Sequence, residues 1–312
     1  MCKMVLRLGW SKSLGLRRLI AGACLSLGGL MAVAAAPAGT ELDWRFVHNG
    51  PESSEDQRYE YHWRVLRAAL EATRVSHGGY VLESVAHMNE SRQLLEMQKP
   101  GGLINTLVLD STVSLEQRLL PVKVPVEKGL LGYRVFLIRA PEQALFSQVR
   151  TLDQLRRFSM GQQADWDDVE IYRAAGFKVV GASSYKALFA MLMSRRFDAL
   201  GRGVIEVEAE LAANRSRFPD MALEQDLLLH YPLAVYFWFP RTDIGRRYHA
   251  RVELGMRQIA ADGTLDRLFR QEFGDLVERL QLNKRRLFEI ANPLLPHDLG
   301  ADKPAWWFDP GR

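Results

Sequence analysis

The chain has 312 residues, of which 41 are lysine or arginine, 37 are aspartate or glutamate and only two are cysteine. This length is enough for two ordinary domains or one large one. The first 38 residues hold five basic residues and no acidic one, which leaves 36 basic and 37 acidic residues in the remainder. That balance lacks the basic excess typical of nucleic-acid binding, so we expect no nucleic-acid partner.

The first 38 residues have the layout of a secretory signal peptide. Basic residues precede an apolar run at 19–36, and Ala36-Pro37-Ala38 offers the small residues that suit a signal peptidase. We therefore predict a periplasmic protein whose mature chain begins near Gly39. A membrane anchor made of about 18 residues rich in glycine and alanine is a poorer match. A lipoprotein site at Cys24 is weaker too, because only five residues separate it from Arg18.

Beyond the signal, short apolar runs alternate with helical patterns. Runs rich in apolar and β-branched residues predict strands at 44–48, 103–109, 133–138, 177–180, 197–200 and 233–239. The run at 233–239 is too apolar for a surface strand, so we expect it to be buried on both faces or to cross between lobes. The tail at 283–312 is expected to pack back onto the protein as ordered coil.

Helices are predicted between these strands. One is indicated by an apolar stripe at helical spacing, formed by Tyr59, Trp63, Leu66 and Leu70. Thr151-Leu152-Asp153-Gln154 has the form of a capping box, and Gly176 is placed to end a helix at 169–175 in a left-handed conformation. Further helices are predicted at 184–195 and within 242–273. The alternation favours parallel α/β sheets with helices on both faces.

Sequence patterns of catalysis and metal binding are missing. The seven histidines are scattered, with no pair at i and i+4 and no His-Glu-x-x-His motif. Cleavage of the signal would remove both cysteines, Cys2 and Cys24, and with them any disulfide or thiol nucleophile. A Gly-x-Ser-x-Gly elbow, a P-loop and a dinucleotide fingerprint are also lacking. We expect no cofactor, no metal and no enzyme activity.

Three parts of the chain together resemble the family 3 periplasmic solute-binding proteins, the amino-acid receptors of ABC transporters. The first is the segment from Asp110 to Arg118, which leads into a proline-containing stretch. The second is 183–199, which ends in Arg196-Phe197-Asp198-Ala199, and the third runs from Tyr236 through Ala261-Asp262-Gly263-Thr264-Leu265-Asp266. The order and spacing of these segments carry the similarity, which spans roughly residues 41–275. The segments 129–133 and 292–296 point to a separate subgroup of the family.

The resemblance implies a type II periplasmic binding protein, with two α/β lobes joined by two crossover strands around a ligand cleft. The first lobe would comprise 39–139 and 236–312, and the second 140–235. A monomer of this kind would bind a small anionic solute, an amino acid or carboxylate, by hinge closure and deliver it to an ABC transporter or membrane sensor. The alternative is an enzyme on the same scaffold, a periplasmic dehydratase or lyase with a carboxylate as general base.

In the first lobe, Arg118 aligns with the family arginine that grips the ligand carboxylate. A planar guanidinium suits that role, because it offers two parallel donors and stays charged. Ser111 would add a hydroxyl or a backbone amide, and Val113 a backbone amide alone. The polar loop after the first strand supplies further candidates, namely Glu52, Asp56 and Arg58.

The second lobe departs from the family pattern. By spacing, Asp165-Trp166-Asp167 stands where amino-acid receptors carry threonine donors, and the aspartate that binds the α-ammonium falls at Gly203. Either Asp165 or Asp167 takes over the ammonium while Trp166 stacks on the ligand, or the ligand has no ammonium and Arg202 binds a second acidic group. Arg202 would otherwise form an ordinary i,i+4 ion pair with Glu206.

Overall fold

The computed structural model describes residues 44–53, 59–295 and 306–311. The predicted signal peptide at 1–38 lies outside these residues, as do the candidate site residues Asp56 and Arg58. Within the described part of the chain, no helix is both long enough and apolar enough to cross a membrane.

Two small sheets and the helices around them use both ends of the chain. Strand β1 pairs in parallel with β2, and β11 lies between β3 and β4, antiparallel to both. The elements of this part are β1 (Arg45–Asn49), α1 (Glu60–Ala72), α2 (Arg74–His77), β2 (Val81–Val85), α3 (Glu90–Gln98), β3 (Leu107–Asp110), α4 (Val113–Arg118), β4 (Leu119–Val122), η1 (Leu130–Gly132), β11 (Val235–Pro240), α10 (Asp243–Ala261), α11 (Thr264–Arg279) and η3 (Leu282–Lys284).

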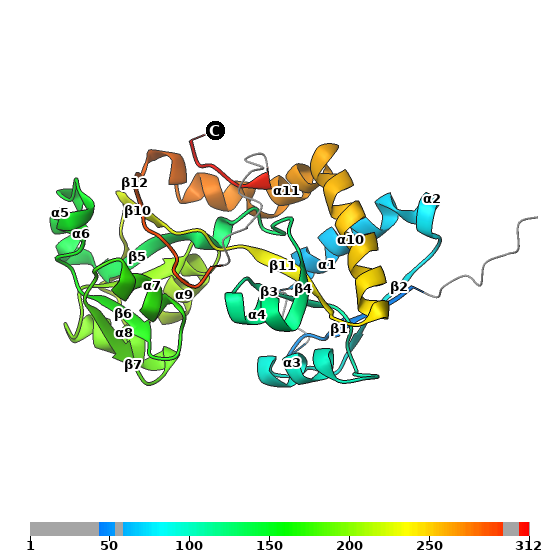
Figure 1. Ribbon diagram of the computed structural model, residues 1–312. Helices are drawn as coiled ribbons and strands as arrows, with labels where there is room; N and C mark the ends of the chain where they lie inside the picture. Colours follow the sequence, from blue (N-terminus) through cyan, green and yellow to red (C-terminus); the bar gives the residue numbers. More distant parts are fainter. Residues whose placement is uncertain (1–43, 54–58, 296–305, 312) are drawn as a thin grey trace, which may run out of the picture. The chain divides into compact units, whose positions relative to one another are not determined.

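Helices α1 and α10 pack side by side next to the β3–β11–β4 sheet (Figure 1). Gly255 on α10 permits the close approach, because a Cβ there would lie 2.1 Å from the Ala69 carbonyl oxygen. The buried face of α1 includes Leu66 and Leu70, as predicted, whereas Tyr59 lies before the helix and is 40% exposed. Strand β11 is buried at all but its last residue, which agrees with its apolar sequence.

The rest of the chain builds a mixed seven-stranded sheet in the order β12-β10-β5-β8-β6-β7, with β9 paired to β5. Strand β6 is parallel to β7 and β8, as expected, but β5 runs antiparallel to its neighbours, so the sheet is mixed rather than parallel throughout. The elements are β5 (Tyr133–Arg139), η2 (Ala140–Glu142), α5 (Gln143–Ser147), α6 (Leu152–Leu155), β6 (Met160–Gln163), α7 (Asp168–Ala174), β7 (Val179–Ala182), α8 (Tyr185–Met193), β8 (Ala199–Gly203), α9 (Val207–Asn214), β9 (Met221–Leu223), β10 (Leu227–His230) and β12 (Arg286–Glu289).

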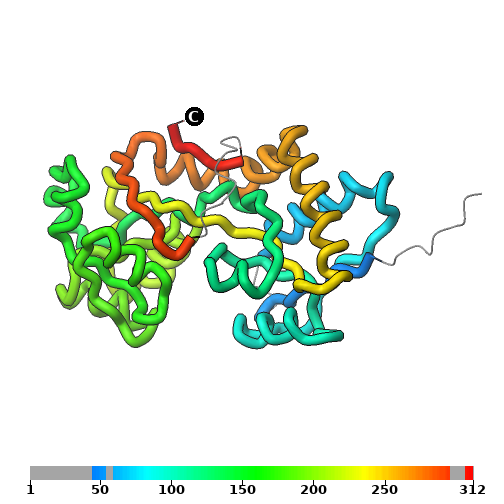
Figure 2. Tube along the Cα trace, viewed as in Figure 1, coloured from blue at the N-terminus to red at the C-terminus, as the bar shows by residue number. Residues whose placement is uncertain are grey.

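The C-terminal tail is more structured than the sequence indicated. Residues 286–289 form β12, which pairs in parallel with β10 in the seven-stranded sheet, so the prediction of coil was wrong there. The last described segment lies beside α11 (Figure 2), where the Phe308 ring packs 5.5 Å from that of Phe269. Its backbone is anchored by a hydrogen bond from the Phe308 amide to the Lys128 carbonyl.

The lobe boundaries near 140 and 235 stay a prediction. Strands β5 and β12, which we had assigned to the first lobe, are hydrogen-bonded into the sheet that contains β6, β8 and β10. Backbone hydrogen bonding, rather than position along the chain, decides which sheet a strand joins, since each strand needs a partner for its N–H and C=O groups.

Candidate ligand-binding site

A cavity of about 380 Å³ opens where β3, β11, α1 and α11 meet the turn that follows β8. Its walls come from segments far apart in the chain and combine polar with apolar groups. The lining residues are Tyr59, Tyr61, His62, Val108, Leu109, Asp110, Glu127, Leu131, Ile205, Glu206, Val235, Glu272 and Phe273.

Four carboxylates line this cavity, whereas its lining contains no lysine or arginine from the described part of the chain. Asp110 ends β3, and burial, reinforced by the negative charges of Asp167 and Glu90, raises its pKa to about 6. Glu272 is balanced by an ion pair with Arg64. The electrostatic character of the cavity is therefore acidic.

Glu127 is the most deeply buried of the four carboxylates, with 3% of the residue exposed. One carboxylate oxygen, Oε1, lies 2.7 Å from Nε2 of His62. The other oxygen, Oε2, has no hydrogen-bond partner among the described residues, and neither does Nδ1 of His62. A buried carboxylate oxygen without a partner is costly, which makes Glu127 a strong candidate for contact with a ligand.

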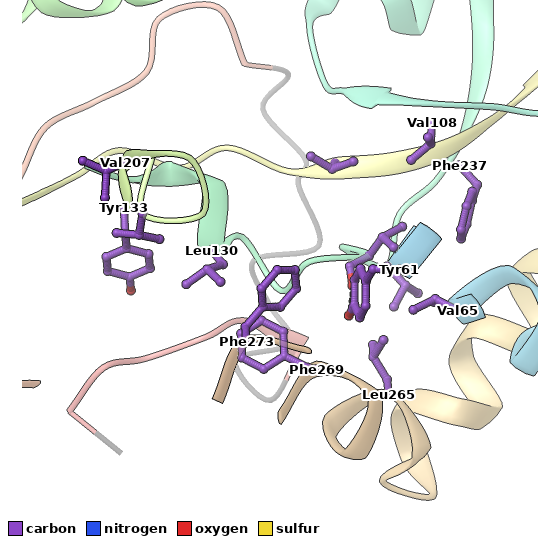
Figure 3. Close-up of a cluster of buried hydrophobic side chains, with 14 of the residues drawn as sticks. Tyr61, Val65, Val108, Leu130, Tyr133, Val207, Phe237, Leu265, Phe269 and Phe273 are labelled. Atoms are coloured by element: carbon purple, nitrogen blue, oxygen red, sulfur yellow. Dashed lines mark hydrogen bonds between the residues drawn. The ribbon is translucent and has the colours of Figure 1, made fainter. Parts of the chain in front are cut away.

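Aromatic rings form another wall of the cavity (Figure 3). The rings of Tyr61 and Phe273 lie 4.9 Å apart, edge to face, and Phe269 continues the cluster 5.3 Å from Phe273. The Tyr61 hydroxyl donates a hydrogen bond to the Val126 carbonyl at 2.8 Å, which fixes the ring. The aromatic wall is thus rigid rather than adaptable.

Glu206 brings a carboxylate to the place where the family aspartate was expected. Its Oε2 accepts a hydrogen bond from the Gly203 amide at 3.1 Å and lies 3.2 Å from Arg202. A Cβ added at Gly203 would lie 2.7 Å from that oxygen. Glu206 thus places a carboxylate directly beside Gly203.

A buried polar network that the sequence analysis missed supports Glu206. Arg134 on β5 lies 3.7 Å from Glu206 and 3.3 Å from Asp168, and it donates to the Tyr231 hydroxyl at 2.5 Å. Burial opposes its charge, but Asp168 and its neighbours outweigh that effect and raise the pKa of Arg134. Arg134 is a charged residue inside an apolar strand sequence, and that unusual position was the sequence signal that could have identified it.

The structure does not bring Arg118 to the cavity. Arg118 is the last residue of α4, it is exposed, and its Nε donates to Oε1 of Gln98 at 3.5 Å. The capping bond from the Leu115 amide to the Thr112 hydroxyl sets the helix register, and that register turns Arg118 to the surface. The predicted carboxylate contact therefore has no geometric support.

Ser111 and Val113 lie close to Asp110 but outside the lining of the acidic cavity. Ser111 is buried, and its hydroxyl has no partner among the described residues. The Val113 amide, which we expected to face a ligand, donates to the Leu294 carbonyl at 3.2 Å. Val113 and Leu294 line a separate, more open cavity of about 460 Å³, together with Asp167.

Arg202 is paired inside the protein. It is 6% exposed, donates three hydrogen bonds to Glu210 at 2.7–2.9 Å, and stacks over Trp166 with 4.5 Å from its central carbon to the ring centre. The expected alternative, an ion pair with Glu206, is present together with the pair to Glu210, and the contact with an acidic ligand group stays a prediction. Trp166 packs on this arginine, and Asp165 is exposed and accepts a hydrogen bond from Gln163 at 2.7 Å.

Among the described residues of the loop after β1, Tyr59 lines the acidic cavity. Glu52 is exposed and is absent from the cavity linings, although Pro51 borders a third cavity of about 370 Å³ beside β1 and β2. Arg58 lies outside the described residues, so its predicted role stays a prediction.

No protein-family model and no curated protein matches the chain. Solved structures do match it. One is YtmK of Bacillus subtilis, a probable extracellular-binding protein of an amino-acid ABC transporter, at 15% identity over 75% of this chain and 97% of that one, with a TM-score of 0.53. Another is YckB of Bacillus subtilis, at 18% identity over 80% and 96% with a TM-score of 0.49. A histidine kinase sensor domain similar to periplasmic binding proteins matches at 13% identity over 73% and 94%, with a TM-score of 0.45.

The likeness to YtmK at this identity shows a shared fold. It agrees with the strand pairing described above, in which a small sheet around β11 and a larger sheet around β5 and β8 are joined by short connections. The chain therefore has the two-lobed α/β fold of the periplasmic binding proteins.

Proposed function

We propose that the protein is an exported receptor that binds a small solute in the acidic cavity and presents it to a membrane transporter or sensor. The observation that supports this proposal is the composition of the cavity wall. Residues that precede β5 or follow β10, such as Asp110 and Glu272, face Ile205 and Glu206 from the turn after β8. A ligand in contact with both sets would stabilise a closed arrangement.

Two connections would serve as the hinge. They are the segment between β4 and β5, which includes Gly129 at φ +73°, and the short link between β10 and β11. Hinge motions need a few residues at element ends that absorb changes in backbone angles. The receptor would act as a monomer, a state that light scattering on the purified protein measures.

Ligand binding is tested first by thermal and chemical unfolding with a panel of small solutes. A ligand at 100 times its Kd adds about 2.7 kcal/mol to the free energy of unfolding. Ile205→Trp should fill the cavity and abolish that gain. The matched control is Ile244→Trp, on the exposed side of α10, which should keep it. Stabilisation that survives Ile205→Trp would place the ligand elsewhere, and no stabilisation by any solute would contradict the receptor proposal.

An enzyme on the same scaffold is the second candidate, and one observation favours it. The raised pKa of Asp110, about 6, would suit a general base in the cavity. NMR of each stabilising solute after prolonged incubation with the protein separates the two functions. A receptor returns the solute unchanged, whereas a lyase converts it to product.

A further inference from the structure

The arginine and backbone donors that the sequence offered to an anionic ligand, where the structure describes them, lie outside the lining of the cavity. The Arg202 guanidinium bonds to Glu210, the Val113 amide bonds to the Leu294 carbonyl, and Arg118 lies on the surface. The cavity lining itself contains no lysine or arginine from the described residues. A carboxylate placed there would lose its hydration and face the four carboxylates of the lining, which is unfavourable.

The negative charges of the four cavity carboxylates are not all balanced by positive side chains among the described residues. Glu206 and Glu272 are balanced by arginines, but Glu127 faces only His62, and its buried Oε2 has no partner among the described residues. Asp110 lines the same cavity and is surrounded by negative neighbours. A ligand with several N–H donors and a positive charge would satisfy both carboxylates.

Two further features indicate that the bound cation is an organic molecule rather than a metal ion. The rings of Tyr61 and Phe273 line the cavity, and aromatic faces attract ammonium and guanidinium groups. In addition, no three His, Asp or Glu side chains in the described part of the chain converge closely enough to hold a metal ion. The negative charges are spread around a volume of about 380 Å³, which suits a cation of several atoms.

Resting on the proposed function, we propose that the solute is an organic cation without a carboxylate, an amine or guanidine compound. Glu127 and Asp110 bind its charged end, Glu206 contributes from the turn after β8, and the aromatic wall packs against its carbon chain.

Calorimetry with a matched four-carbon series tests the charge directly. The probes are 1,4-diaminobutane, 4-aminobutanoate, butanedioate and 1,4-butanediol, joined by agmatine and choline as larger cations. We expect measurable binding for at least one carboxylate-free cation, at least tenfold tighter than for the zwitterion, the dianion or the diol. Glu127→Gln and Asp110→Asn should each weaken that binding about thirtyfold or more, because each leaves a desolvated charge without its partner.

The control variant is Glu253→Gln, which removes a half-buried carboxylate on α10 that is paired with Arg257, outside the cavity lining, and should leave affinity unchanged. Glu127→Gln keeps an acceptor for His62, and circular dichroism confirms that each variant is folded. Binding of an anion or neutral solute that Ile205→Trp abolishes would overturn the cation inference and leave the receptor proposal standing. Cation binding unaffected by both carboxylate variants would overturn the assignment, and no binding across the wider solute panel would overturn both proposals.

Discussion

Arg202 and Glu210 form a buried pair whose two parallel hydrogen bonds are covered by the Trp166 ring. We expect Arg202→Ala to lower the free energy of unfolding by about 3 kcal/mol, because it leaves Glu210 buried without a cation. Arg118→Ala is the control and should change stability by less than about 0.5 kcal/mol. Urea unfolding measures both, and equal values for the two variants would contradict the structural role of the pair.

Asp110 gives the stability a defined pH dependence. Its pKa in the folded protein, about 6, exceeds that of an unfolded aspartate, so Asp110 favours folding while it is protonated. That contribution is present below about pH 4 and is lost as the pH rises through 6. Without ligand, Asp110→Asn should therefore gain about 2 kcal/mol over the wild type between pH 4 and 7. Urea unfolding at several pH values measures both proteins. A constant difference in the free energy of unfolding between Asp110→Asn and the wild type from pH 4 to 7 would contradict this prediction.

At the scale of the residue, the structure shows the surroundings of the candidates, while their contacts with a ligand stay a prediction. Asp110 is the first residue of the segment that carried the family resemblance, and Arg118, its last residue, is turned to the surface by the register that Thr112 imposes on α4. Glu206 was considered only as a partner of Arg202. Its position beside Gly203 depends on how the chain turns after β8, which local sequence patterns do not encode.

At the scale of the element, patterns with a local physical cause were the most informative. The capping box at Thr151 is present with both of its bonds, and Gly176 has φ +84° after α7, as predicted. The apolar run at 233–239 became the buried β11. Strand β12 was missed because its four residues have weak alternation, and its stability comes from pairing with β10, more than fifty residues earlier.

The backbone conformation at position 129 and the neighbouring Trp307 ring require a glycine there, which a substitution can test. Its φ is +73°, and a Cβ there would lie 2.5 Å from the Trp307 ring. Gly263 has a similar φ of +79° with nothing within 4 Å of its Cβ position, so Gly263→Ala should cost only the left-handed strain of about 1 kcal/mol. We expect Gly129→Ala to cost at least about 1 kcal/mol more, because Trp307 must move. Equal costs in guanidinium unfolding would show that Trp307 contributes nothing at the hinge.

At the scale of the whole molecule, export is the testable property of the N-terminal segment. We expect periplasmic material to begin near Gly39, as measured by intact-mass spectrometry. Because the first described strand starts at Arg45, protein produced without residues 1–38 should unfold with the same free energy as the exported form. A product that retains Cys24 with an attached lipid would contradict cleavage at this site.

The strand order also has a kinetic consequence that bears on the proposed export. Strand β3 pairs with β11, more than a hundred residues further on, and β10 lies between β5 and β12, the last strand of the sequence. Closing loops of this length is entropically costly, and folds dominated by non-local pairing form slowly. Neither larger sheet can be completed until the C-terminal third of the chain has been synthesised. If the protein is exported as proposed, slow folding would leave the nascent chain extended for longer, which suits a secretion channel that threads extended polypeptide.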